Sequence, residues 1–148
     1  MIGSLRERLI GAWRLVDVVK ETVAGAPGGR PHGDHPVGLI LYTADGFMSA
    51  QIMDPDRRPV ASVDWSSLSP EEYADEARGY FAYAGPFEVD EERGTVTHSV
   101  EVSLFPGWVG GVQLRVIELD GDHLVLSGAA PEESGGELVT TRISWVRA

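Results

Sequence analysis

One ionisable side chain interrupts an otherwise apolar strand face in the second half of the sequence. In the alternating segment Thr95–Phe105, His98 shares a face with aliphatic residues, namely Val96, Val100, Val102 and Leu104. A histidine can give or take a proton near neutral pH, so His98 is a candidate general acid or base. It can equally be a core histidine held by hydrogen bonds. Under either interpretation, a buried His98 needs a hydrogen-bond partner.

A positively charged side chain, Arg115, lies on the next alternating segment, Val112–Leu119. Gln113 and Arg115 share one face of this segment with Ile117 and Leu119. If that face points inward, Arg115 would bind a carboxylate or enolate, because a bare buried guanidinium is strongly disfavoured, and Gln113 would hydrogen-bond beside it. If the register slips by one residue, both side chains face solvent. His98 and Arg115 are the candidates for catalytic roles, and the sequence leaves both registers open.

The segment Phe47–Met53 offers two faces of different composition. Met48, Ala50 and Ile52 form a purely apolar set, whereas Phe47, Ser49, Gln51 and Met53 combine large apolar groups with an amide. Ligand-facing walls have this mixed composition, so we predict that Phe47, Gln51 and Met53 face a ligand. The alternative is that Gln51 simply faces water.

Aromatic residues provide further candidates. Trp108 lies in a predicted loop with no core of its own to fill, and it could cap a cavity. Tyr80 and Tyr83 could close another rim, or all three could plug the barrel ends. Tyr42 is a further polar anchor. The predicted ligand-binding set is Tyr42, Phe47, Gln51, Met53, His98, Trp108, Gln113 and Arg115.

Metal and covalent chemistry have little support in the sequence. His32, Asp34 and His35 have metal-like composition, but they lie in the Gly/Pro-rich loop Ala24–Pro36 with no standard metal spacing. We therefore predict no metal and no cofactor. The chain has no cysteine, which excludes thiol catalysis and disulfides. It also has no nucleophile-elbow motif for covalent hydrolysis.

The composition is that of an acidic globular chain. With 148 residues, 43% of them hydrophobic, residues 1–148 are expected to form a single domain. The net charge of −11 repels phosphate, so nucleic acid and anionic membranes are not expected partners. The segment Met1–Arg8 lacks the apolar stretch of a secretion signal. Together with the absence of cysteine, this predicts a cytoplasmic protein.

Short strands must position these side chains. Alternation and β-branched residues predict strands at Leu9–Glu21, Val37–Tyr42, Phe47–Met53, Phe87–Asp90, Thr95–Phe105, Val112–Leu119, His123–Ser127 and Leu138–Val146. A capping box at Ser69–Glu72 begins one helix, with Tyr73, Ala77, Phe81 and Ala84 on its apolar face. About eight antiparallel strands with one mid-chain helix predict an all-β barrel or sandwich. An eight-stranded barrel can hold one small ligand.

A resemblance favours the barrel. Gly11-Ala12-Trp13, at the start of the first strand, resembles the Gly-x-Trp signature of lipocalins and their calycin relatives. The resemblance implies that Trp13 closes the barrel bottom and that an arginine of the last strand packs over its ring. Arg147 is the matching candidate, with Arg142 as second choice.

A second resemblance extends from Leu9 to Arg147. The segments His35–Gly38, Tyr42–Gln51 and Thr97–Gly110 are similar to a family of bacterial and fungal lipocalin-like domain proteins. It implies an eight-stranded antiparallel lipocalin-like barrel with a cavity. The general activity of that family is undefined, although some members are encoded beside genes of secondary metabolism. Secreted lipocalins carry signal peptides and usually disulfides, so extracellular transport is not carried over to this chain.

Three possibilities remain open at this point. The first is intracellular binding of a small, largely apolar molecule in the barrel cavity. The alternative is a cofactor-free cyclase or isomerase of a polyketide-like secondary metabolite, in which His98 moves a proton and Arg115 stabilises negative charge. A filled, purely structural barrel is a third possibility. The expected partner is a small hydrophobic or amphipathic molecule, and a homodimer through a barrel edge or the Trp108 loop could also form.

Overall fold

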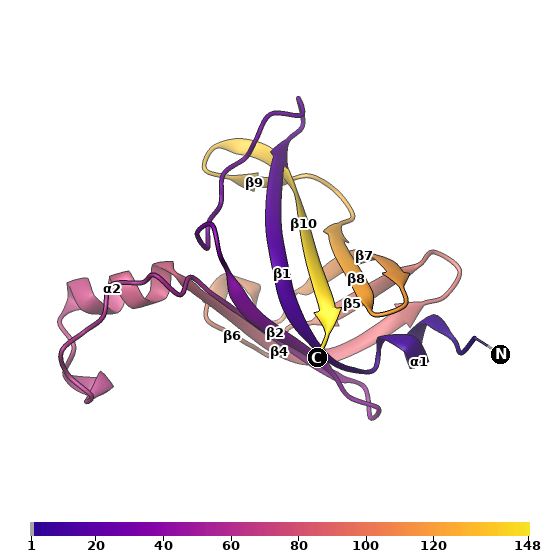
Figure 1. Ribbon diagram of the computed structural model, residues 1–148, viewed down its shortest axis with the longest axis horizontal. Coiled ribbons are helices and arrows are strands. Elements are labelled where there is room, and N and C mark those ends of the chain that lie inside the picture. The colour runs from indigo at the N-terminus through magenta and orange to yellow at the C-terminus, as the bar shows by residue number, and fades with distance from the viewer. Residues whose placement is uncertain (1) are drawn as a thin grey trace.

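The strands of the chain close into a barrel in the computed structural model, which describes residues 2–148 (Figure 1). Each strand pairs antiparallel with the next, and the last pairs with the first. The barrel strands are β1 (Gly11–Thr22), β2 (Val37–Tyr42), β3 (Phe47–Met53), β4 (Tyr80–Asp90), β5 (Thr95–Ser99), β7 (Val112–Asp120), β8 (His123–Gly128) and β10 (Glu137–Arg147). The predicted eight-stranded antiparallel barrel is therefore confirmed.

Shorter elements decorate the barrel. Two short strands pair at its edges, β6 (Val102–Ser103) with β4 and β9 (Glu132–Ser134) with β10. The helices are α1 (Leu5–Leu9), α2 (Pro70–Arg78) and the 3-10 turns Trp65–Ser67 and Pro106–Trp108. α1 was not expected from the sequence, although a capping box between Ser4 and Glu7 begins it.

One end of the barrel is closed by Trp13, as the family resemblance implies. The Trp13 ring is fully buried, and its Nε1 donates a hydrogen bond to Leu9 O at 2.9 Å. The Arg147 guanidinium lies 4.0 Å from the centre of this ring and donates to the carbonyls of Ile10 and Arg8 at 3.0 and 2.6 Å. Arg142, the second choice, instead pairs with Glu118 on the surface. The predicted contact between Trp13 and Arg147 is confirmed.

The mid-chain helix is shorter than its apolar pattern suggested. α2 ends at Arg78, and β4 begins at Tyr80, so Phe81 and Ala84 lie in a strand. Their spacing from Tyr73 mimics a helical repeat, but the first part of β4 pairs with β3, from Met53 opposite Tyr80 to Phe47 opposite Pro86. The pairing of β4 with β3 thus outweighs the helical spacing of the apolar residues in this part of the sequence.

The predicted strand Thr95–Phe105 is broken in the middle. β5 ends at Ser99, and β6 begins at Val102. At the break, β4 approaches so closely that a Cβ on Gly85 would lie 1.8 Å from Ser99 O. Only glycine fits there. Val102 and Leu104, expected on the inner face with His98, are consequently exposed.

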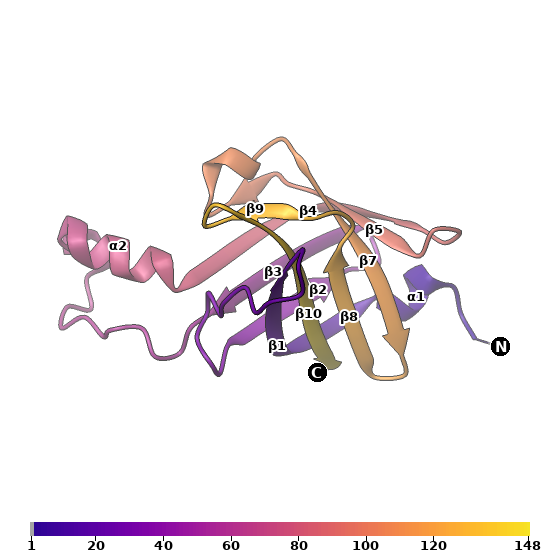
Figure 2. The ribbon, with the colours of Figure 1, turned by 90° about the horizontal axis from the view of Figure 1, so that it is seen from above.

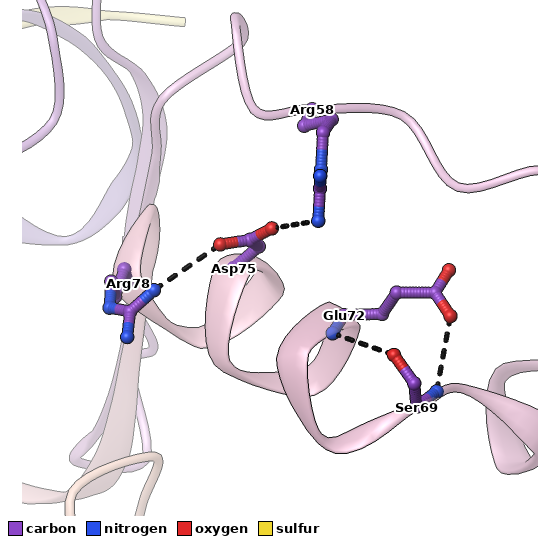
Figure 3. A network of polar contacts seen from close by, with 5 residues as sticks. All are labelled: Arg58, Ser69, Glu72, Asp75 and Arg78. Carbon is purple, nitrogen blue, oxygen red and sulfur yellow. Dashed lines mark hydrogen bonds and ion pairs between the residues drawn. The ribbon is translucent and has the colours of Figure 1, made fainter.

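The segment between β3 and β4 leaves the barrel. In both views α2 lies beyond the end of β4, away from the other strands (Figures 1 and 2). Its capping box joins Ser69 to Glu72, and Asp75 pairs with Arg58 and Arg78 (Figure 3). These polar contacts hold the helix, because none of its residues is fully buried. Within residues 2–148, no helix has the length and apolarity needed to cross a bilayer.

Candidate functional site

The barrel encloses a cavity of about 200 Å³. Its walls are mainly aliphatic and aromatic side chains, namely Val18, Ile40, Ala50, Ile52, Phe81, Trp108, Leu126, Ile143 and Trp145. A few polar groups interrupt them, namely Lys20, His32, Tyr83, His98, Arg115, Glu132 and Thr141. Pro31 and Glu132 line the cavity and are also exposed, so the cavity meets solvent between them. An apolar cavity with a few polar groups is the usual form of a small-molecule site.

A buried chain of hydrogen bonds connects three strands beside the cavity. His98 on β5 is fully buried, and its Nε2 lies 2.8 Å from the hydroxyl of Tyr42 on β2. Its Nδ1 lies 2.6 Å from the hydroxyl of Tyr83 on β4. Of the three, Tyr83 and His98 line the cavity. The expected partner of a buried His98 is therefore a pair of tyrosines, one on each side.

The direction of these hydrogen bonds follows from burial. A neutral imidazole has one donor and one acceptor nitrogen. Within residues 2–148, the Tyr42 hydroxyl has His98 Nε2 as its sole partner. If Nε2 carried the proton, the buried Tyr42 O–H would have no acceptor, at a cost of about 1–3 kcal/mol. We therefore infer that Tyr42 donates to Nε2 and that Nδ1–H donates to Tyr83 Oη.

Electrostatics keep all three groups neutral. Burial, with a further contribution from the Arg115 charge, lowers the pKa of His98 to about 3. Burial raises the pKa of Tyr83 to about 12, and it also raises the pKa of Tyr42. Near neutral pH, His98 is thus an uncharged imidazole with both nitrogens occupied. As a proton-transfer group it has no free lone pair to offer a substrate.

Arg115 points inward, which selects the first of the two registers. Its side chain is 13% exposed and borders the cavity. Nη2 donates to Gln113 Oε1 at 2.9 Å, Nη1 donates to Leu114 O at 3.1 Å, and Glu132 Oε1 lies 3.6 Å away. Gln113 therefore holds the guanidinium rather than lining the cavity itself. The protein supplies the partners that a buried cation requires.

The face of β3 was assigned wrongly. Met48, Ala50 and Ile52 point inward, and Ala50 and Ile52 line the cavity. The predicted ligand-facing residues Phe47, Gln51 and Met53 lie on the opposite, outer face. Phe47 is 47% exposed, and Gln51 accepts a hydrogen bond from Tyr80 on the outside of the barrel. The inward-facing set is the purely apolar one, and Ala50 and Ile52 make this part of the cavity wall hydrophobic.

Trp108 forms part of the cavity wall. Its ring lies edge-on to Phe81 and Tyr83, with centroid distances of 4.8 and 5.4 Å. The 3-10 turn Pro106–Trp108 places it there. Of the predicted ligand-binding residues, the structure thus brings His98, Trp108 and Arg115 together at the cavity, with Tyr42 and Gln113 behind them. Tyr80 lies on the outer face of the barrel.

Several cavity residues were missed from the sequence. Phe81 had been placed in the helix, and Trp145 was not among the predicted site residues. Two buried polar atoms have no hydrogen-bond partner among residues 2–148, Trp145 Nε1 and His32 Nδ1, and both residues line this cavity. No sequence pattern could have marked these two residues, because whether a buried polar atom has a partner depends on its neighbours in space.

Comparison with known proteins identifies the family. Residues 10–148 match the family described as lipocalin-like domain, so the chain belongs to the lipocalin-like domain family. A relative, the 4'-hydroxy-3'-methoxypropiophenone carrier protein of Aspergillus oryzae, is 36% identical over 104 residues. The match covers 66% of this chain and 94% of that protein. The barrel and this relative together support a small-molecule binding or carrier role.

Proposed function

We propose that this protein binds and carries a small, largely apolar molecule inside its barrel. The observation that carries the proposal is the cavity of about 200 Å³, with apolar walls and a few polar groups. An apolar cavity of about 150 Å³ is enough to bind benzene. The cavity therefore suits one ring with short substituents. The relative is named for a molecule of this kind, a substituted single-ring ketone.

Binding accounts for the polar groups better than catalysis does. A cyclase or isomerase would use His98 as its base, yet both nitrogens of His98 are engaged by tyrosines. Arg115 is likewise held by Gln113 and Glu132. Groups whose partners are all supplied by the protein are suited to fixing the shape of a cavity.

Two measurements test this proposal. Native mass spectrometry of the gently purified protein is expected to show an extra mass that is lost on denaturation. Titration with 4'-hydroxy-3'-methoxypropiophenone, followed by tryptophan fluorescence, is expected to saturate at one molecule per chain, because Trp108 and Trp145 line the cavity. A protein that shows neither a retained mass nor a saturable response contradicts the proposal.

A matched pair of variants on β3 locates the site. Ala50 lines the cavity, whereas Gln51, one residue along, is exposed on the outer face. Ala50→Phe should fill the cavity and weaken binding more than tenfold, because the added ring occupies the volume that the ligand needs. Gln51→Phe should leave the affinity unchanged. Circular dichroism checks that both variants fold. Equal affinities in the two variants would place the ligand outside the barrel.

A further inference from the structure

The sequence contains one lysine, and its side chain enters the barrel. Lys20 lies on β1, two residues from Val18, which is buried in the core. Side chains two residues apart on a strand point to the same face, so both are directed inward. Lys20 accordingly lines the cavity together with Val18. A strongly hydrated ammonium group thus borders a cavity whose walls are mainly hydrophobic.

The strand register places this ammonium over the open end of the cavity. Lys20 pairs with Thr141 on β10, and Thr141 also lines the cavity. On the other side of β10, Glu132 of β9 pairs with the buried Val139, so the inner face of the sheet continues onto β9 (Figure 1). Ser134 shares that face of β9, and Lys20 Nζ donates to its hydroxyl at 3.1 Å. The Lys20 side chain therefore crosses the inner face of β10.

The Lys20 ammonium has no negatively charged partner. It has three N–H donors, and within residues 2–148 its hydrogen-bond partner is the neutral hydroxyl of Ser134. No carboxylate oxygen of these residues lies within 4.0 Å of Nζ. The nearby His32 does not offset the charge, because burial and the Lys20 charge both lower its pKa and keep the ring neutral.

The lining of the cavity therefore carries a positive charge in an acidic protein. The charged residues that line the cavity are Lys20, Arg115 and Glu132. Arg115 and Glu132 form an ion pair, so the charge of Lys20 is left over. The chain as a whole has a net charge of −11, which repels anions at long range. Only groups at the cavity itself can favour an anion.

We propose that the cavity binds its ligand as a carboxylate, which accepts hydrogen bonds from the Lys20 ammonium at the open end while an apolar body fills the cavity below. This inference rests on the proposed function and adds an acidic group to the ligand. The ligand class is small apolar carboxylic acids. A carboxylate offers the ammonium both charge and acceptors, whereas a neutral molecule of the same shape leaves the charge without a counterion.

Two probes of nearly the same shape test the preference for an anion. At pH 7, 3-phenylpropanoate is charged, whereas 3-phenylpropanamide is neutral. Isothermal titration calorimetry of the wild-type protein is expected to show that the acid binds about tenfold more tightly than the amide. The net charge of the chain would by itself favour the amide, so a preference for the acid reports a local cation.

Three variants assign that preference to Lys20. In Lys20→Met, which keeps an unbranched side chain without the charge, the ratio of the two affinities should fall close to one. Lys20→Arg restores a cation and should restore the preference for the acid. Arg142→Met is the matched control, because it removes the same charge from the outer face of β10, where Arg142 pairs with Glu118. In this control the ratio should stay as in the wild-type protein.

Two further measurements do not depend on replacing Lys20. Glu132 is 54% exposed, and Glu132→Gln removes a negative charge from the same end of the cavity. The affinity for the acid should rise about threefold relative to the amide. Reductive methylation with carbon-13 formaldehyde keeps the charge of the Lys20 amine and labels the single lysine for nuclear magnetic resonance. The signal that is absent from Lys20→Arg should shift with the acid and much less with the amide.

The outcomes separate this inference from the proposed function. If the amide binds as tightly as the acid, or if Lys20→Met keeps the preference, the role of Lys20 is overturned and the binding function stands. If neither probe binds but the purified protein retains a ligand mass, the preference for carboxylic acids is overturned alone. If neither probe binds and no retained mass or saturable response is found, both proposals fail.

Discussion

The two ends of the barrel are built from different kinds of contact. At the closed end, Trp13 and Leu9 are fully buried, and the Arg147 guanidinium binds two backbone carbonyls. At the open end, the cavity is bordered by a loop and short elements that carry Pro31, Trp108 and Glu132. The fully buried contacts around Trp13 thus lie at one end of the barrel, and the exposed residues that border the cavity lie at the other. Substitutions should therefore separate stability from binding.

The largest effect is expected from the closed end. Trp13→Ala removes a fully buried indole together with its hydrogen bond to Leu9 and its contact with Arg147. The free energy of unfolding should fall by about 3–5 kcal/mol. Urea denaturation followed by circular dichroism measures it. A loss below about 1 kcal/mol would mean that the closed end is not where the barrel's stability resides.

An intermediate effect is expected from pH, through His98. Its pKa in the folded protein is about 3, below the ordinary value of 6.5, so the unfolded chain binds a proton first as the pH falls. The stabilisation is complete above pH 6.5 and is lost as the pH falls toward 3, so that about 2 kcal/mol is lost by pH 5. The stability of His98→Gln should therefore fall less steeply below pH 6.5. If the wild-type protein and His98→Gln lose stability in parallel below pH 6.5, the pKa of His98 is not lowered in the folded protein and solvent reaches its ring.

The smallest effect on stability is expected at the open end. Trp108 is half-buried and contacts Phe81 and Tyr83 through edge-on ring pairs. Trp108→Ala should lower the free energy of unfolding by about 1 kcal/mol. The same change should weaken ligand affinity about tenfold, because the cavity loses part of its wall. Thermal denaturation and ligand titration on one sample compare the two losses. A stability loss as large as that of Trp13→Ala would abolish the division between the ends.

Much of the barrel could be predicted from the sequence because its signals are local. Strands β2 and β3 begin and end where the alternating segments Val37–Tyr42 and Phe47–Met53 do. The position of His98 on an inner face also follows from alternation, since Val96 and Val100 beside it are buried. The Trp13–Arg147 contact came from the family resemblance, as spacing alone does not bring the chain ends together.

The features that escaped prediction depend on tertiary structure. The inner face of β3 was misassigned because its outer face also carries large apolar groups such as Phe47, so composition did not mark the cavity side. The start of β4 was hidden because Phe81 fits a helical repeat from Tyr73 as well as a strand alternation with Tyr83. That Trp145 lacks an acceptor is a statement about its neighbours in space, which no local pattern encodes.

The excursion that carries α2 begins and ends at one point of the sheet. Met53 and Tyr80 are directly paired, and Asp54 N donates to Gly79 O at 2.7 Å, so the β3–β4 ladder continues to the point where the chain departs. The entropic cost of closing a loop grows only slowly with its length. The length of the segment inserted there should therefore have little effect on the free energy of unfolding of the barrel. This junction is therefore an insertion site for engineering. We expect that a reporter domain or affinity tag can replace residues 55–78 while the cavity keeps its lining.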